Sequence, residues 1–255
     1  DTIEIDYGAQ LTLGSADSEP ADYVNDATAI KSRGGTVSLY HHLQRVATET
    51  LGTLELLQGF THVSARPSDP LYFNSLDRSP GSILYFSLHS GPGGVGFHSR
   101  PDLELGMIGP WAVTENGFAT LNDDGLFETL TATARSFATA TPVEHVLLAG
   151  SETLAKDAIV ASLQSQRPDD SIDLGGQQLT VTSGGLFRTA NIVNGRLTAG
   201  DGTDAELVAN FSNRMISADI VDHPAGGSVA LVINSGKMTL SGQNSYTGGT
   251  WVVGS

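Results

Sequence analysis

The chain has 255 residues, of which 13 are Lys or Arg and 28 are Asp or Glu, so its formal net charge is −15 at pH 7. This charge argues against a nucleic-acid-binding protein, because such proteins neutralise phosphates with basic side chains, and the few lysines are too scattered for a polybasic membrane patch. The absence of cysteine excludes disulfides and thiolate catalysis. No apolar run reaches the roughly 18 residues of a membrane-spanning helix, while a hydrophobic fraction of 39% is enough to build a core.

Short segments in which apolar and polar residues alternate run along the whole chain. Alternation with period 2, in runs rich in Thr, Val and Ile, predicts half-buried β-strands. Glycine pairs such as residues 34–35 and 248–249 supply the turns between them. In chain order, the clearest strand predictions are residues 2–5, 10–14, 36–39, 53–57, 178–182, 196–200 and 237–242.

Two longer segments have some helical character. Residues 39–57 contain Thr-rich breaks and an alternating Thr-Leu-Glu-Leu run, and residues 151–166 contain an Ile-Val-Ala-Ser-Leu run that suits a strand as well as a helix. We predict strands in both, which makes the chain all-β.

A recurring string distinguishes a solenoid from a sandwich or a barrel. Related versions of x-Leu-Thr-Leu/Val/Ala-x-Gly occur at Leu11, Leu179, Leu197 and Met238, and Leu179 precedes Leu197 by 18 residues. This spacing is close to the coil of a β-solenoid, about 20–30 residues. Such coils bury their apolar edges only by stacking on their neighbours, which gives parallel strands about 4.8 Å apart. At this coil length the chain would make about ten to twelve coils.

The segment from Met238 to Thr250, MTLSGQNSYTGGT, resembles the signature of the autotransporter-associated β-strand repeat, also called the passenger-associated transport repeat. The positions that carry this motif are Leu240, Gly242, Asn244, Tyr246, Thr247, Gly248, Gly249 and Thr250. Further upstream, residues 174–186 resemble a coil of long proteins in this family, and residues 108–120 resemble a looser segment. The resemblance covers most of the chain, strongly after about Ser171 and loosely before it.

This resemblance implies an exported or cell-surface, right-handed parallel β-helix with no catalytic residues to carry over. We therefore expect residues 1–255 to form one β-solenoid segment, with irregular loops concentrated between about Arg66 and Asp102. The expected role is structural, as a stalk, surface filament or adhesin passenger outside a bacterial cell, without a cofactor. Asn244 suits a tight corner, and Tyr246 can bury its ring while its hydroxyl stays in water.

Both ends of the chain have strand patterns and neither resembles a polar cap. Residues 1–14 resemble the strand pair that follows the YTGGT motif in the family, so the end of one unit would continue into the start of the next. Uncapped solenoid ends pair edge to edge. We expect identical units to stack head to tail, either as tandem repeats of a longer protein or as separate subunits.

The main alternative is a carbohydrate-active β-helix, either a polysaccharide hydrolase or a lyase. Such enzymes use clustered carboxylates for general acid–base chemistry, and Asp123 and Asp124 form the candidate pair in the segment Asn122–Gly125. The Gly-His-Gly and Arg-x-Lys elements that accompany such a pair are missing, so a solvated turn is the competing interpretation. A further alternative is an adhesive module that binds surface glycans through its loops.

The remaining candidates are weaker. Asp201 and Asp204 enclose a Gly and place oxygens close together, as calcium loops do, but the repeated nonapeptide of calcium-binding β-rolls is missing. The adjacent His41 and His42 would point to opposite faces of a strand, and the other histidines lack ligand spacing, so no metal site is predicted. The aromatic residues Phe97, Trp111, Phe118 and Phe127 are expected to stack in the core rather than to line a sugar-binding face.

Overall fold

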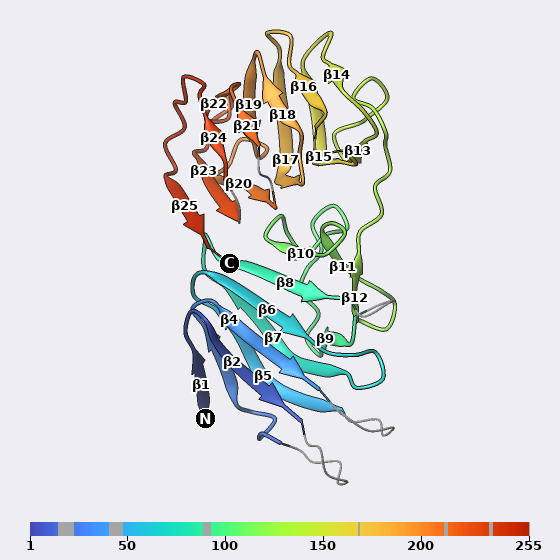
Figure 1. The fold of residues 1–255 in the computed structure, drawn as a ribbon, viewed down its shortest axis with the longest axis vertical. Helices are drawn as coiled ribbons and strands as arrows, with labels where there is room; N and C mark the ends of the chain where they lie inside the picture. The colour runs from blue at the N-terminus through green and yellow to red at the C-terminus, as the bar shows by residue number, and fades with distance from the viewer. Residues whose placement is uncertain are drawn as a thin grey trace. The chain divides into compact units, whose positions relative to one another are not determined.

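The computed structural model describes residues 1–14, 23–40, 48–88, 93–167, 169–211, 214–234 and 237–254. These residues form an all-β, parallel β-solenoid of about ten coils (Figure 1). Within them there is no helix, and hence none long and apolar enough to cross a membrane. The predicted fold class is therefore confirmed. His41 and His42 lie outside the described residues.

The solenoid is divided into two compact units. The first unit holds Asp1–Ile108 and Ala112–Leu130, and the second holds Gly109–Trp111 and Thr131–Ser255.

In the first unit each coil contributes strands to two parallel sheets. Sheet 1 has the order β1 (Thr2–Ile5), β3 (Ala29–Ser32), β5 (Glu49–Leu56), β7 (Leu71–Arg78) and β9 (Val95–Phe97). Sheet 2 has the order β2 (Ala9–Leu13), β4 (Gly35–Leu39), β6 (Phe60–Ser64), β8 (Ile83–Ser87) and β10 (Ala112–Thr114). An antiparallel hairpin follows, formed by β11 (Ala119–Leu121) and β12 (Phe127–Thr129).

The second unit also consists of stacked parallel coils. Sheet 3 has the order β13 (His145–Leu148), β15 (Ala158–Ser165), β17 (Gln178–Phe187), β20 (Ala205–Asn210), β23 (Val229–Asn234) and β25 (Thr250–Val253). The first half of β17 also pairs with β19 (Arg196–Ala199), which in turn pairs with β22 (Asp219–Ile220). Sheet 4 has the order β14 (Glu152–Thr153), β16 (Ser171–Asp173), β18 (Asn191–Val193), β21 (Met215–Ile216) and β24 (Thr239–Leu240).

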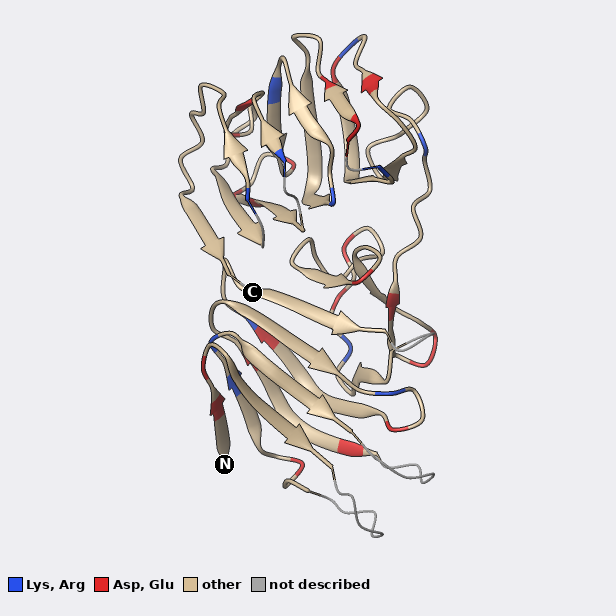
Figure 2. Cartoon of the chain, viewed as in Figure 1, with Lys and Arg blue, Asp and Glu red and all other residues tan. Residues whose placement is uncertain are grey.

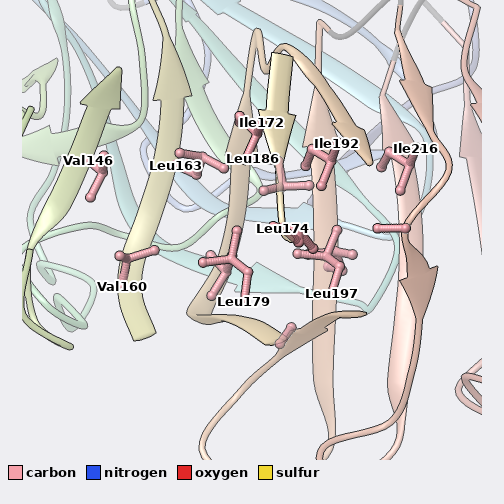
Figure 3. Packing of buried hydrophobic residues seen from close by; sticks show 14 of the residues in the cluster. Val146, Val160, Leu163, Ile172, Leu174, Leu179, Leu186, Ile192, Leu197 and Ile216 are labelled. Atoms are coloured by element: carbon pink, nitrogen blue, oxygen red, sulfur yellow. The ribbon is translucent and has the colours of Figure 1, made fainter. Parts of the chain in front are cut away.

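The predicted repeat corresponds to a real coil. Leu179 in β17 lies opposite Leu197 in β19, in parallel register, so the 18-residue spacing read from the sequence is one turn of the solenoid. Apolar residues then stack in columns along the interior, as in Ile172, Ile192, Ile216 and Leu240 of sheet 4. Figure 3 shows part of this core, with Leu179, Leu186 and Leu197 pointing into it.

Both segments of ambiguous helical character are strands where they are described. β5 lies within residues 39–57 and β15 within residues 151–166. Stacking on neighbouring coils stabilises the extended backbone in both segments. The expectation of irregular loops between Arg66 and Asp102 was wrong, since β7, β8 and β9 occupy much of that range. In β7, Leu71 and Phe73 point into the core and pair with β5, a periodicity that the loop prediction overlooked.

Candidate functional site

The candidate catalytic pair, Asp123 and Asp124, lies in the turn of the β11–β12 hairpin. The Asn122 side chain organises this turn, because its Oδ1 accepts the backbone N–H groups of Asp124 at 3.0 Å and Leu126 at 2.9 Å. The Arg100 Nη2 donates to the backbone carbonyl of Asp123 at 2.6 Å. Both aspartates are exposed at the surface. The guanidinium therefore braces the backbone of the turn, and a local hydrogen-bonded turn accounts for the Asn-Asp-Asp-Gly sequence.

The calcium candidates, Asp201 and Asp204, direct their carboxylates to different partners. Asp201 Oδ1 accepts the Thr203 hydroxyl at 3.0 Å and the Thr203 N–H at 3.3 Å. Asp204 Oδ1 accepts the N–H of Ser228 at 2.7 Å and its hydroxyl at 2.9 Å, one coil further on. Within the described residues, no group of three or more His, Asp or Glu side chains could hold a metal ion.

Asp204 belongs to a set of corner residues that sequence reasoning missed. In this set a side-chain oxygen accepts a backbone N–H from an adjacent coil. Asp222 Oδ1 accepts Val229 N–H at 2.7 Å and Thr247 N–H at 2.9 Å, and its Oδ2 accepts the Thr247 hydroxyl at 2.8 Å. Asp219 Oδ1 accepts Gln243 N–H at 2.6 Å. No fixed residue spacing identifies these partners in the sequence, because the coils differ in length.

These hydrogen bonds stabilise the ionised forms of Asp201, Asp204 and Asp222. The N–H and hydroxyl of Ser228 lower the pKa of Asp204 below its ordinary value. The N–H of Val229 lowers the pKa of Asp222 most strongly, desolvation opposes this shift, and the N–H and hydroxyl of Thr247 lower the pKa further. The hydroxyl and N–H of Thr203 lower the pKa of Asp201. General acids need a raised pKa near neutral pH, so these carboxylates are suited to holding backbone rather than to donating protons.

The C-terminal motif forms a corner of the last described coil. Leu240 adds to the apolar column of sheet 4, and Asn244 Oδ1 accepts the Ile220 N–H at 2.9 Å. The half-buried Tyr246 packs against the core cluster, and its hydroxyl lies 2.7 Å from Thr250 Oγ1. Thr247 is the partner of Asp222 described above.

The motif glycines have separate steric reasons. A Cβ on Gly242 would lie 2.4 Å from the Ala218 carbonyl oxygen, and one on Gly248 would lie 2.6 Å from the Val229 carbonyl oxygen. Gly249 instead has a positive φ of 90° and open space around it. The motif therefore brings two backbones of adjacent coils close together and then turns the chain.

Buried polar side chains elsewhere also serve the backbone. In the first unit, Glu49 is 1% exposed, and its carboxylate accepts the N–H groups of Tyr23 at 3.0 Å and Val24 at 3.1 Å. In the second unit, Asn210 Nδ2 donates to the Pro110 carbonyl and Asn210 Oδ1 accepts from Asn234 Nδ2, both at 2.8 Å. The two asparagines are fully buried in adjacent coils and form a short ladder.

A hollow of about 410 Å³ in the second unit lies between residues 137–142 and the corner at residues 152–159. Its acidic lining residues are already engaged. Glu152 accepts the Ser136 hydroxyl and the Phe137 N–H, and Asp157 Oδ1 accepts the Gln178 N–H. The hollow therefore presents braced carboxylates and an exposed Lys156, not a paired acid and base.

The aromatic residues Phe97, Phe118 and Phe127 are buried in the first unit, at 3% exposure or less. Phe97 and Phe127 meet edge to face, with centroids 5.3 Å apart. The prediction that they stack in the core is confirmed for these three residues, while Trp111 is half-buried in the second unit.

Comparison of the chain with family models, with curated proteins and with solved structures finds no match.

Proposed function

We propose that this chain is a structural β-solenoid segment of an extracellular bacterial protein, working as a stalk, a surface filament or an adhesin passenger. The observation that carries the proposal is the use of its carboxylates. Asp204, Asp219 and Asp222 each bind backbone N–H groups of the coil that follows. Side chains used in this way hold adjacent coils together, as a stalk or filament under mechanical force requires.

The resemblance of the C-terminal motif to autotransporter-associated repeats supports the extracellular placement. The net charge of −15 supports it further, because mutual repulsion keeps crowded acidic segments apart and soluble.

We further propose that copies of this chain join head to tail through their end strands. In the described residues β25 pairs only with β23, and β1 pairs only with β3, so each has one unpaired edge. Val252 in β25 is 76% exposed. A parallel strand added at either edge would repeat the ladder that already joins the coils.

Sedimentation velocity and negative-stain microscopy of the 255-residue chain over a concentration series test this proposal. We expect linear assemblies that lengthen with concentration. Val252→Pro should abolish them, because proline removes a ladder donor, whereas Val252→Thr keeps the strand and should assemble like the parent. A parent chain that stays monomeric at the highest concentration, or a Val252→Pro variant that assembles normally, would count against head-to-tail joining.

The enzyme alternative has its own test. Incubation with pectins and other acidic or neutral polysaccharides, followed by reducing-end and unsaturated-product assays, should give no product. Depolymerisation that is lost in Asp123→Asn and Asp124→Asn variants would replace the structural role with a catalytic one.

A further inference from the structure

The outer face of sheet 2 carries no charge. Within their bounds, the strands β2, β4, β6 and β8 contain no Lys, Arg, Asp or Glu. Figure 2 shows β4, β6 and β8 in uniform tan, whereas acidic and basic residues colour other strands. In a chain with a net charge of −15, this surface, which we call the uncharged face, is set apart by its chemistry.

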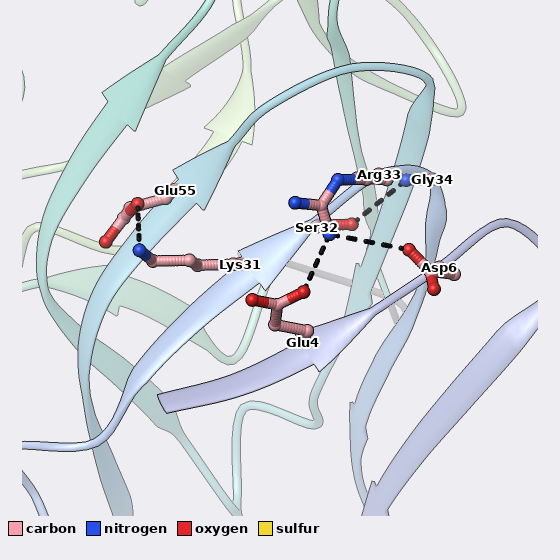
Figure 4. Close-up of polar contacts among 7 residues, drawn as sticks. All are labelled: Glu4, Asp6, Lys31, Ser32, Arg33, Gly34 and Glu55. Carbon is pink, nitrogen blue, oxygen red and sulfur yellow. Dashed lines mark hydrogen bonds and ion pairs between the residues drawn. The ribbon is translucent and has the colours of Figure 1, made fainter. Parts of the chain in front are cut away.

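Sheet 1 in the same unit shows the contrast. Its outward column contains Glu4, Lys31 and Glu55 in register, with Lys31 Nζ 3.4 Å from Glu55 Oε2 (Figure 4). Arg33 Nη1 lies 2.8 Å from Glu4 Oε2 and 3.6 Å from Asp6 Oδ1. Charge ladders are thus available to this solenoid, and the uncharged face has none.

One outward column of the uncharged face consists of hydroxyl groups. Thr12, Ser38, Ser64 and Ser87 lie in parallel register on successive coils, at a spacing of about 4.8 Å. Ser38 Oγ donates to Thr12 Oγ1 at 3.2 Å, and Gln10 Nε2 donates to Thr12 Oγ1 at 2.9 Å. These contacts orient the hydroxyls, and each hydroxyl still has capacity for further hydrogen bonds.

The neighbouring outward column adds rings. His62 and Tyr85 are in register, with ring centroids 5.1 Å apart, and His62 Nε2 lies 2.7 Å from Ser87 Oγ. Phe60 stacks on Tyr85, with centroids 5.7 Å apart and planes at 28°. All three rings are half-buried, while the inward residue Val63 is fully buried. The rings are therefore held in place by their neighbours and are partly exposed.

We propose that the uncharged face binds an extended, neutral, β-linked glucan. In such a polymer each sugar ring presents C–H groups on its faces and hydroxyls around its edge. The rings of Phe60 and Tyr85 would pack against the C–H faces, and the hydroxyl column would bond the sugar hydroxyls. The hydroxyl column repeats on each coil from β2 to β8, which suits a ligand that itself repeats. The rings lie on β6 and β8, and Gln10 and Thr36 hold the equivalent positions of β2 and β4. The proposal stands apart from the structural role.

Charge and polarity favour this ligand over others. An anionic polysaccharide would be repelled by a protein of net charge −15, whereas a neutral glucan would not. A stable protein interface is usually built around an apolar centre, but this face has a column of polar hydroxyls beside its rings.

Depletion from solution by microcrystalline cellulose and affinity electrophoresis in hydroxyethylcellulose test the proposal, with polygalacturonate as the charged comparison. The double variant Phe60→Thr/Tyr85→Thr removes both rings and keeps residues of high β propensity. Ser38→Lys keeps the rings and places a long cation across the hydroxyl column. Tyr7→Thr is the matched control, because Tyr7 is an aromatic residue 70% exposed in the turn after β1. Circular dichroism and thermal midpoints verify that each variant is folded.

We expect the parent chain to bind both neutral probes and to ignore polygalacturonate. Both face variants should bind about tenfold more weakly or worse, and Tyr7→Thr should bind like the parent. The proposal is overturned if the parent binds neither neutral probe, if it binds polygalacturonate equally well, or if folded face variants bind normally. It is also overturned if Tyr7→Thr loses as much binding. The same holds if the parent chain is a dimer and the face variants change only its dissociation into monomers, not its binding to the glucan.

Discussion

At the scale of single residues, several acidic side chains of this protein serve as acceptors for backbone donors. The buried Glu49 accepts backbone N–H groups in the first unit, and Asp204 and Asp222 accept them at the corners of coils in the second unit. Their value depends on the donors that would lose a partner, because an unpaired N–H away from water is costly. Surface ion pairs such as Lys31–Glu55 contribute far less.

Two glutamates of β5 provide a matched comparison. Glu49→Ala should lower the free energy of unfolding by about 2 kcal/mol, because the N–H groups of Tyr23 and Val24 lose their acceptor. Glu55→Ala removes only a partly exposed ion pair and should change it by less than about 0.5 kcal/mol. Urea denaturation of both variants measures the difference. Equal effects would show that the buried carboxylate has no special role.

The corner aspartates predict the response to acid. The pKa values of Asp204 and Asp222 are lowered in the folded state, so the stabilisation that these two carboxylates provide is complete above the pH at which the unfolded carboxyl titrates, about 4. It is lost as the pH falls through the lower folded values. Denaturant midpoints should therefore decline steeply below about pH 4.

In Asp222→Asn the denaturant midpoint should fall less steeply as the pH decreases, because the variant has no carboxylate to protonate at this corner. Asp123→Asn, on the exposed hairpin turn, is the control and should follow the parent chain. Midpoints measured between neutral pH and about pH 3 distinguish them. An Asp222→Asn variant with the same acid dependence as the parent would show that the corner contacts are not linked to folding.

At the scale of elements, coil stacking requires close approaches that only glycine allows. Gly184 lies in β17, where the pairing with β15 shifts register between Val160 and Ser162. A Cβ at Gly184 would lie 1.8 Å from the Glu206 carbonyl oxygen of the next coil. Gly176 has a similar positive φ, 81° against 77°, but nothing within 4 Å.

This pair separates backbone strain from collision between coils. Gly176→Ala should lower the free energy of unfolding by about 1–2 kcal/mol, the penalty for an alanine with a left-handed backbone conformation. Gly184→Ala should cost about 1–3 kcal/mol more, because β17 and β20 must move apart. Thermal and urea unfolding measure both variants, and equal losses would mean that the coils accommodate a Cβ without strain.

At the scale of the whole molecule, net charge controls association. The charge of −15 at pH 7 falls toward zero near pH 4.6, the isoelectric point calculated from the sequence. Repulsion between copies then vanishes, while Asp204 and Asp222, whose pKa values are lowered, remain ionised.

Light scattering should therefore rise as the pH approaches 4.6 with the fold intact, and should fall again when the pH returns to 7. Added salt at pH 7 should have a weaker effect in the same direction, because it screens the same charges. A particle size that stays constant from pH 7 to 4.6 would contradict this account. Circular dichroism at each pH controls for unfolding.

The sequence by itself determined the fold class, several of the strands and the coil. Alternation within a strand is a local property, since neighbouring side chains point to opposite faces, and the repeat that links Leu179 to Leu197 shows directly in the order of residues. The strands of β7 to β9 were overlooked because their alternation is mixed with polar turns.

Only the tertiary structure decided which residues meet across coils. Register partners are as few as 17 residues apart, as in Val146 and Leu163, or as many as 28, as in Leu84 and Ala112. With coils of such unequal length, no fixed period leads from Asp222 to Thr247 or from Glu49 to Tyr23. The division into two units and the uncharged face likewise arise from stacking, because stacking sets side by side residues that are far apart along the chain.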